Sequence, residues 1–322
     1  MTEKPRIVVT RKLPAPVEER IKHIFDATFN TVDTVLASDD LIARAKGADG
    51  LLITPADKLR ADVIARLPAS VRIVATFSVG HDHIDVPAAL KLGLTVTNTP
   101  DVLTDATADI AMLLILGAAR GASWGERMVR EKRWGLWSPT YPLGLDVTGK
   151  RLGILGMGRI GQAVAKRARG FDMQIHYHNR SRLSPDLEQS AVFHDMFHAM
   201  LPHCDFLSVN CASTPETRGA INAGAIALMP DGAVVVNTAR GDIVDDDALI
   251  AALGSGKLAA AGLDVFRGEP DIDPRYRDLD NAFLLPHLGS ATMETRIAMG
   301  MRAVDNLVAF FAGKPPRDAL KA

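Results

Sequence analysis

The chain of 322 residues is predicted to be an α/β protein with two Rossmann-like domains, each a doubly wound parallel sheet. Three observations predict this fold class. Short apolar runs alternate with helical patterns over residues 6–97, and a second series of the same kind begins near Lys150. The second series contains a glycine motif between a strand and a helix. One long helix follows the last predicted strand, so we expect it to pack back against the first series.

The first series ends near Asn98-Thr-Pro100. Its strands are predicted from β-branched runs and its helices from apolar residues at helical spacing. The predicted strands are Arg6–Thr10, Gly50–Thr54, Val71–Thr76 and Leu94–Thr97, and the predicted helices are Pro16–Phe25 and Ala61–Leu67. Two further helices, Thr104–Gly121 and about 125–133, lead into an irregular segment, 134–144, whose Pro, Gly and aromatic residues predict a long ordered loop.

The second series repeats the alternation of strand and helix. The predicted strands are Arg151–Leu155, Met173–His178, Phe206–Asn210, Ala233–Asn237, Ala260–Asp264 and Phe283–Leu285. The predicted helices are Arg159–Arg169, Ala248–Leu253 with Asp245–Asp247 as its cap, and the final helix at about 292–312.

Composition favours a cytoplasmic globular protein with no nucleic-acid or membrane partner. Basic and acidic residues nearly balance, at 37 and 38, whereas a nucleic-acid binder shows a basic excess. The apolar run Ile110–Ala119 is too short for a bilayer, which needs about 20 residues, and the charged N-terminus lacks the apolar stretch of a signal peptide. Two cysteines, Cys204 and Cys211, do not suggest a disulfide framework.

The glycine motif Gly156-Met157-Gly158-Arg159-Ile160-Gly161 predicts a dinucleotide site. It follows an apolar strand and opens a helix, which is the context that the mechanism requires. The first glycine permits a tight turn, the second lets the backbone approach a pyrophosphate, and the third allows close helix–strand packing. The phosphates would then lie at the positive end of the helix.

The end of the next predicted strand indicates which dinucleotide binds. NAD-binding sites usually place Asp or Glu there, bonded to the ribose 2′-hydroxyl. Here the segment reads Asn179-Arg180-Ser181-Arg182, and no acid occurs from Met173 to Pro185. Guanidinium groups bind a 2′-phosphate bidentately, whereas a carboxylate would repel it. We therefore expect NADP(H) as the cofactor, with NAD(H) as a weaker possibility.

Three polar residues each follow a predicted strand of the second series. They are Arg240, Glu269 and His287. In a doubly wound sheet the carboxyl ends of the strands lie at one edge, where ligands bind. We therefore expect these three side chains to meet there as a catalytic group.

At this point the sequence resembles the D-isomer-specific 2-hydroxyacid dehydrogenases. Seven segments carry the resemblance in the order of that family: Ser78–Gly80, Asn98–Pro100, the glycine motif, Pro215–Thr217, Asn237–Gly241, Gly268–Pro270 and Pro286–Thr292. Within the family, Asn179–Arg182 is similar to the NADPH-preferring glyoxylate/hydroxypyruvate reductases. The resemblance implies hydride transfer between a nicotinamide cofactor and a small 2-keto acid.

The family fold implies that the cofactor domain is inserted into a discontinuous substrate domain. The substrate domain would comprise residues 1–99 and 289–322, and the dinucleotide-binding domain residues 100–288. Within this fold, Arg240 would hold the substrate carboxylate, and His287 would act as general acid and base on the substrate oxygen. Glu269 would orient His287 and favour its charged form. The amides of Val79 and Gly80 would bind the carboxylate from the other domain.

The resemblance also implies contacts to the cofactor outside the glycine motif. Asp264 would fix the nicotinamide amide. The other implied contacts are Thr104, Cys211, Thr217, Thr238, Ala239 and Ser290, in addition to Asn179–Arg182. A homodimer is expected, with the helix Thr104–Gly121 and the loop 134–144 at its contact. Trp137 and Tyr141 could either close the partner's substrate pocket or serve in dimer packing alone.

Several alternatives remain open from the sequence. The substrate could be a larger 2-keto acid, although Leu51–Pro55 offers no basic residue for a phosphorylated one. A formate dehydrogenase is disfavoured because the family's enzymes of that kind carry Gln in place of Glu269. A different class is a dinucleotide-sensing binding protein like the family's corepressor relatives. His194 and His198, four residues apart, could share a helix face, but no recognised metal-site spacing completes them, so no metal is expected.

Overall fold

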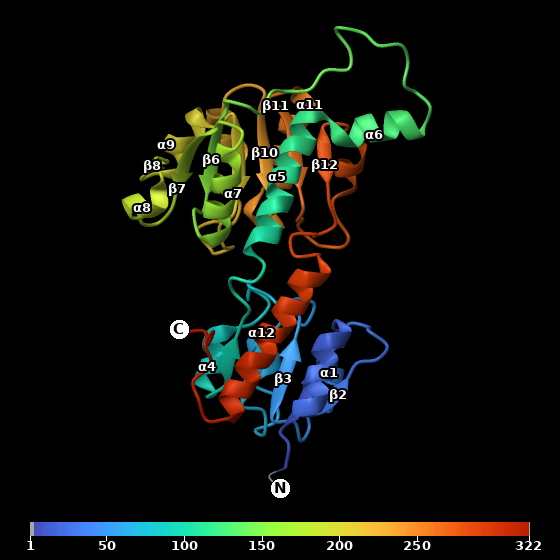
Figure 1. Ribbon diagram of the computed structural model, residues 1–322, viewed down its shortest axis with the longest axis vertical. Coiled ribbons are helices and arrows are strands. Elements are labelled where there is room, and N and C mark those ends of the chain that lie inside the picture. The colour runs from blue at the N-terminus through green and yellow to red at the C-terminus, as the bar shows by residue number, and fades with distance from the viewer. Residues whose placement is uncertain (1–2, 322) are drawn as a thin grey trace. The chain divides into compact units, whose positions relative to one another are not determined.

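Both predicted series form parallel β-sheets, one in each of two compact units (Figure 1). The structure is a computed structural model and describes residues 3–321. The first unit contains the chain up to Leu103 together with the chain from Ala291 onward, and the second unit is Thr104–Ser290. The predicted fold class, two doubly wound parallel-sheet domains, is therefore confirmed.

The first unit is a five-stranded sheet with the order β2-β1-β3-β4-β5. Its strands are β1 (Arg6–Val9), β2 (Asp26–Phe29), β3 (Gly50–Ile53), β4 (Ile73–Thr76) and β5 (Thr95–Thr97). Its helices are α1 (Ala15–Ile24), α2 (Ser38–Arg44), α3 (Ala61–Ile64), α4 (Val86–Lys91) and α12 (Met293–Phe311). Strand β2 was not predicted, because this edge strand alternates exposed and half-buried residues and has no continuous apolar run.

The long C-terminal helix α12 belongs to the first unit, as predicted. It contacts α1 and β4. Gly300 permits this approach, since a Cβ atom there would lie 2.5 Å from a methyl carbon of Val17. The chain thus leaves the first unit after Leu103, completes the second sheet and returns.

The second unit is a seven-stranded parallel sheet with the order β12-β11-β10-β9-β6-β7-β8. Its strands are β6 (Arg151–Leu155), β7 (Gln174–His178), β8 (Val192–His194), β9 (Phe206–Val209), β10 (Ala233–Asn237), β11 (Leu258–Leu263) and β12 (Ala282–Leu284). Its helices are α5 (Thr104–Arg120), α6 (Ala122–Arg130), α7 (Arg159–Arg169), α8 (Pro185–Glu188), α9 (Phe197–Met200), α10 (Ala223–Leu228) and α11 (Asp246–Ser255), with 3₁₀ turns η1 (Leu201–His203), η2 (Gly241–Ile243) and η3 (Pro274–Asp278).

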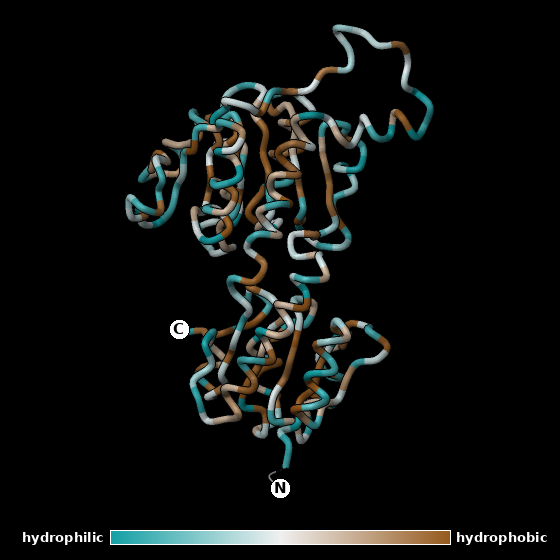
Figure 2. Tube along the Cα trace, viewed as in Figure 1, coloured by the Kyte–Doolittle hydropathy of each residue, from teal (hydrophilic) through white to brown (hydrophobic). Residues whose placement is uncertain are grey.

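Both faces of the second sheet are covered, which explains its continuous apolar strands. On β10, Val234 and Val236 join the core under α5 and α7, whereas Val235 joins the core on the opposite face. Figure 1 shows α5 and α7 on one face of the sheet, and Figure 2 shows the hydrophobic colouring concentrated in the strands that they cover. This burial on both faces fixes the strand ends that carry the polar residues.

Helix α6 differs from the prediction by beginning three residues earlier and ending at Arg130. Gly121 separates it from α5 with a positive φ of 63°, and a Cβ atom at Gly121 would overlap the ring of Trp124. Among the described residues, no single helix meets the length and hydropathy criteria for a membrane span. Helices α5 and α6 meet them jointly, although the chain bends by 67° between them.

Candidate functional site

Arg240, Glu269 and His287 follow three strands that are neighbours in the second sheet. Arg240 follows β10, Glu269 lies on the loop after β11, and His287 follows β12. All three strands are parallel, so their carboxyl ends lie at the same edge. The structure therefore brings these residues to one edge of one unit.

The imidazole of His287 is paired with the carboxylate of Glu269. Nδ1 of His287 lies 2.7 Å from Oε2 of Glu269, and Oε1 of Glu269 accepts a 2.6 Å hydrogen bond from the amide of Phe266. An ionised carboxylate only accepts hydrogen bonds, so Nδ1 carries the proton in this contact. Nε2 of His287 is then the nitrogen left for a ligand, and the side chain is half exposed, at 49%.

The charge on Glu269 follows from its surroundings. Burial would raise its pKa, but the hydrogen bonds from His287 and Phe266, with the positive charge of Arg240, lower the pKa of Glu269 below its ordinary value of 4.5. The carboxylate is therefore ionised at neutral pH. It favours a positive charge on the ring that it holds.

The loop that carries Arg240 is held by Asn237, the last residue of β10. Its side-chain amide donates to the carbonyl of Arg240 over 2.9 Å, and its oxygen accepts from the amide of Ala239 over 2.9 Å. The guanidinium donates to the carbonyl of Ala239 over 2.7 Å. Asn237 stood within the motif that carried the family resemblance, but its positioning role required the structure.

Gly241 brings this loop against the loop that carries Glu269. A Cβ atom at Gly241 would lie 1.9 Å from the carbonyl carbon of Phe266 and 2.2 Å from the nitrogen of Arg267. No side chain fits in that space. The backbone next to Arg240 therefore touches the backbone whose amide binds Glu269.

Asp264, at the end of β11, is fully buried and organises the loop of His287. Its two carboxylate oxygens accept from the amides of Leu288 and Gly289 over 2.6 and 2.8 Å, and its carbonyl accepts from the amide of His287. Burial raises the pKa of Asp264, although these amides act in the opposite direction. Asp264 is expected at the nicotinamide amide from the family resemblance, and its carboxylate also holds the backbone after His287.

The glycine motif forms the turn between β6 and α7. Gly156 has a φ of 95°, and a Cβ atom on it would lie 2.6 Å from the nitrogen of Cys211. At Gly161 a Cβ atom would lie 2.3 Å from the carbonyl oxygen of Gly156. At Gly158, by contrast, it would meet nothing within 4 Å. The motif is thus tightly packed at both ends and open at its centre, at the start of a helix of 11 residues, which fits a pyrophosphate.

The segment after β7 differs from a plain basic loop. Asn179 accepts a 2.7 Å hydrogen bond from the amide of Met157, so it shapes the glycine turn. Arg180 and Ser181 are exposed. Arg182 has a partner that was not predicted from the sequence: its Nε and Nη2 donate to Glu188 over 2.8 and 3.0 Å.

Most other residues expected at the cofactor lie around the same sheet edge. Cys211 adjoins Gly156, and burial raises the pKa of its thiol to about 11. Thr238 donates weakly to Asn210, over 3.4 Å. Thr217 is engaged within its own turn, donating to the carbonyl of Ala212. The remaining expected contacts are Arg159 and Ile160 at the start of α7, Ala239 before Arg240, Ser290 after the His287 loop, and Thr104 at the start of α5.

The loop after β4 in the first unit carries Val79 and Gly80. Its carbonyls are engaged: the Gly80 carbonyl accepts from the Ser78 hydroxyl over 2.7 Å, and the Val79 carbonyl accepts from the Asn98 side chain over 2.8 Å. Within the described residues, the amides of Val79 and Gly80 have no hydrogen-bond acceptor. Two neighbouring backbone donors of this kind suit an anion such as a carboxylate.

The histidines of the second unit do not form a metal centre. His194 lies on β8 and His198 in α9, so they do not share a helix face. His194 instead lies 3.0 Å from His176, and burial lowers the pKa of His176 to about 4. No group of three or more His, Cys, Asp or Glu side chains in residues 3–321 is arranged to hold a metal ion.

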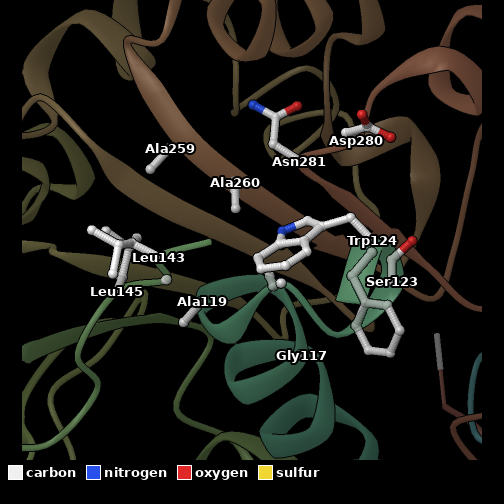
Figure 3. A pocket seen from close by; sticks show the side chains of 14 residues that line it. Gly117, Ala119, Ser123, Trp124, Leu143, Leu145, Ala259, Ala260, Asp280 and Asn281 are labelled. Atoms are coloured by element: carbon white, nitrogen blue, oxygen red, sulfur yellow. The ribbon is translucent and has the colours of Figure 1, made fainter. Parts of the chain in front are cut away.

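A cavity of about 320 Å³ in the second unit lies away from these residues (Figure 3). It is lined by α5, α6 and the starts of β11 and β12, which is the amino edge of the sheet, and Trp124 projects across it. The adjoining segment 131–144 exposes large apolar side chains, including Trp134, Leu136, Trp137 and Tyr141 at 70, 100, 85 and 66%. Helix α5 itself is mostly buried in the core of its own unit.

Comparison with known proteins identifies the family. Residues 112–289 match the family described as "D-isomer specific 2-hydroxyacid dehydrogenase, NAD binding domain". The chain is 46% identical to a glycerate dehydrogenase of Hyphomicrobium methylovorum, over 96% of this chain and 97% of that one. A protein of Polaromonas sp. JS6 66, described as a D-isomer specific 2-hydroxyacid dehydrogenase, superposes with a TM-score of 0.93 at 47% identity, covering 99% of this chain and 100% of that one.

A further solved structure is an NADPH-dependent glyoxylate/hydroxypyruvate reductase from Sinorhizobium meliloti in complex with NADP and malonate. It is 34% identical, with a TM-score of 0.89, and the match covers 99% of this chain and 97% of that one. These similarities extend over both units. They agree with a domain that binds a nicotinamide dinucleotide and with a small hydroxy or keto acid as substrate. The chain therefore belongs to the family of D-isomer-specific 2-hydroxyacid dehydrogenases.

Proposed function

We propose that this dehydrogenase is an NADPH-dependent reductase that converts small 2-keto acids, glyoxylate and hydroxypyruvate, to 2-hydroxy acids. The observation that carries the proposal is the pair of His287 and ionised Glu269 at the sheet edge that also presents Arg240. A protonated imidazole beside a guanidinium suits a substrate with a carboxylate next to a carbonyl.

His287, Glu269 and Arg240 each have a distinct role in the proposed reaction. His287 gives a proton from Nε2 to the substrate oxygen in reduction and takes it back in oxidation. Glu269 holds Nδ1 and stabilises the charged ring. Arg240 binds the carboxylate and polarises the carbonyl. A bound nicotinamide cofactor supplies the hydride.

The two units take the roles of cofactor domain and substrate domain. The cofactor domain, for which we keep the expected bounds of residues 100–288, would hold the dinucleotide on the glycine turn, where the open space at Gly158 leaves room for a pyrophosphate. Residues 1–99 and 289–322 form the substrate domain, in which the amides of Val79 and Gly80 bind the substrate carboxylate. Hydrogen bonds to the carbonyls of Val79 and Gly80 hold this loop in place, which supports the role.

The preference for NADP(H) rests on the segment after β7. Its first residue, Asn179, carries no charge and is already bonded to the amide of Met157. The exposed Arg180 and Ser181 then offer a guanidinium fork and a hydroxyl to a 2′-phosphate. The reductase of Sinorhizobium meliloti, which is described as NADPH-dependent, supports the same direction.

A homodimer is part of the proposal. The segment 131–144 exposes apolar side chains that a monomer would leave in water, and a second copy of the chain would cover them. Because α5 is mostly buried within its own unit, we assign the contact chiefly to α6 and this segment.

The test is a steady-state assay of the purified enzyme with glyoxylate, hydroxypyruvate and larger 2-keto acids, each with NADPH and NADH. We expect the highest kcat/KM for the two small acids with NADPH. Replacement of Arg180 by Gln should raise KM for NADPH by roughly tenfold and leave KM for NADH unchanged, as expected for one charged contact. The exposed Lys166→Gln variant is the control.

The alternatives give different outcomes. Higher kcat/KM with a bulkier acid would assign the enzyme to larger 2-keto acids. Tight nucleotide binding with no turnover on the whole panel would favour a dinucleotide-sensing protein. Equal or better use of NADH would refute the cofactor preference.

A further inference from the structure

A buried acid from outside the segment Asn179–Arg182, which we propose binds the cofactor ribose, holds this segment in place. Glu188, the last residue of α8, lies six residues beyond Arg182, and its side chain is 7% exposed. Its carboxylate accepts from Nε and Nη2 of Arg182 and from the hydroxyl of Tyr177, the last over 2.5 Å. Glu188 thus binds both the loop after β7 and the strand itself.

Tyr177 completes the connection. Its ring is fully buried, and its oxygen accepts a 3.0 Å hydrogen bond from the amide of Leu183 while its hydroxyl donates to Glu188. The chain from Tyr177 to Leu183 is therefore closed by side-chain contacts that converge on Glu188. The guanidinium of Arg182 also lies over the ring of Phe193, 5.9 Å from its centroid.

The contact is an ion pair at neutral pH. Arg182 first, and then Tyr177, hold the pKa of Glu188 below its ordinary value. Both nitrogens used by Arg182 belong to one edge of its guanidinium fork, which is the edge that would otherwise bind two oxygens of a phosphate. To reach a 2′-phosphate by that edge, Arg182 would have to leave a buried carboxylate without its counter-ion, and such a loss is costly.

We propose that Glu188 is a specificity-determining residue that holds Arg182 back from the cofactor and so limits the preference for NADP(H) over NAD(H). The 2′-phosphate is then left to Arg180 and Ser181. This inference rests on the proposed NADP(H) site and deepens it, because it assigns opposite roles to the two arginines of one short segment.

Replacement of Glu188 by Gln tests the inference. The amide keeps the shape and one acceptor for Tyr177 but removes the charge that retains Arg182. We expect the ratio of kcat/KM for NADPH to that for NADH to rise by about tenfold, the value of one charged hydrogen bond, through a lower KM for NADPH at unchanged kcat. The same shift is expected in the dissociation constant of NADP⁺, measured by calorimetry without turnover.

Two further variants show whether Arg182 carries the change. The charge-neutral double variant E188Q/R182Q should lose the whole gain. The single variant R182Q, at a side chain that is 65% exposed, should change KM for NADPH by less than about twofold, because Arg182 does not contact the phosphate in the parent enzyme. Asp186→Asn, which removes an exposed charge from the same short helix, is the matched control and should leave the ratio unchanged.

An unchanged or lowered ratio in E188Q, a gain that persists in the double variant, or a large loss of NADPH use in R182Q would each overturn the inference. If E188Q does not fold, the R182Q measurement decides alone, by the same criterion. Failure of the proposed NADP(H) preference is recognised separately, from the parent enzyme and Arg180→Gln.

Discussion

Nδ1 of His287 lies 2.7 Å from Oε2 of Glu269, and the second oxygen of that carboxylate is held by the amide of Phe266. The acid is therefore fixed at both oxygens. It cannot turn away without breaking a bond to its own loop. This contact fixes the orientation of the imidazole. The backbone of His287 is held as well, because its amide donates to the carbonyl of Asp264.

Replacement of Glu269 by Gln should lower kcat/KM for reduction chiefly at neutral pH. The pKa of Glu269 is lowered, so its charge is present at neutral pH and is lost only as the pH falls below 4.5. The amide keeps the shape but removes the charge, so kcat/KM should fall by roughly tenfold at neutral pH, and the difference from the parent enzyme should narrow as the pH falls below 4.5, where the parent carboxyl also becomes protonated. Glu131→Gln, at an exposed pair, is the control. A difference of the same size at neutral and acid pH would contradict the assignment.

Replacement of His287 by Gln should lower kcat by roughly 10²–10⁴-fold, the usual contribution of a general acid. The dissociation constant of NADPH should remain within a factor of about two, because the glycine turn that holds the dinucleotide is untouched. Stopped-flow turnover and fluorescence titration measure the two quantities. Near-normal turnover would exclude His287 as the proton donor.

Replacement of Arg240 by Lys should impair the substrate and spare the cofactor. An ammonium keeps the charge but cannot bind a carboxylate with a planar fork. We expect kcat/KM for glyoxylate to fall by roughly 100-fold, equivalent to the loss of one bidentate charged contact. Arg277→Lys, an exposed position, should behave like the parent enzyme. A rise in the NADPH dissociation constant with no fall in kcat/KM for glyoxylate at saturating cofactor would argue against a substrate role.

Replacement of Gly241 by Ala should damage both the stability and the site. The new methyl group would overlap the backbone of Phe266 and Arg267, so one of the two loops must move. We expect a loss of about 1–3 kcal/mol in the free energy of unfolding, typical of overpacking, together with reduced kcat. Gly254→Ala in α11 is the control: a Cβ atom there meets nothing within 4 Å, and alanine is the better helix former. Equal behaviour of the two variants in urea melts would refute this account.

The double variant Leu136→Ser/Trp137→Ser should dissociate the proposed homodimer. Both side chains are almost fully exposed in the single chain, at 100 and 85%, so their replacement should not disturb the fold. Light scattering after gel filtration should give a dimer for the parent protein and a monomer for the variant at micromolar concentration. Val32→Ser, at an exposed apolar residue of the first unit, should remain dimeric. A parent protein that is already monomeric would exclude the dimer.

The sequence by itself determined the two parallel sheets, the glycine turn and the positions of Arg240, Glu269 and His287 at strand ends. Apolar runs buried on both faces, such as Ala233–Asn237, have few alternatives to a central strand. The polar residues that follow such strands are then placed by the sheet. Edge strands such as β2 and β8 were missed because half-exposed residues give no continuous apolar signal.

Only the tertiary structure decided which hydrogen bonds hold the loops of these residues and which charged side chains are already engaged in ion pairs. No local pattern relates Asp264 to the amides of Leu288 and Gly289, 24 and 25 residues away, because that contact depends on the pairing of β11 with β12. The same limit applies to Arg182. The sequence around Arg182 indicates a basic loop. In the fold, the carboxylate of Glu188 lies against the guanidinium of Arg182 and forms an ion pair with it. The sequence determines the chemistry of a side chain, whereas the packing of helices and strands determines which groups that side chain contacts.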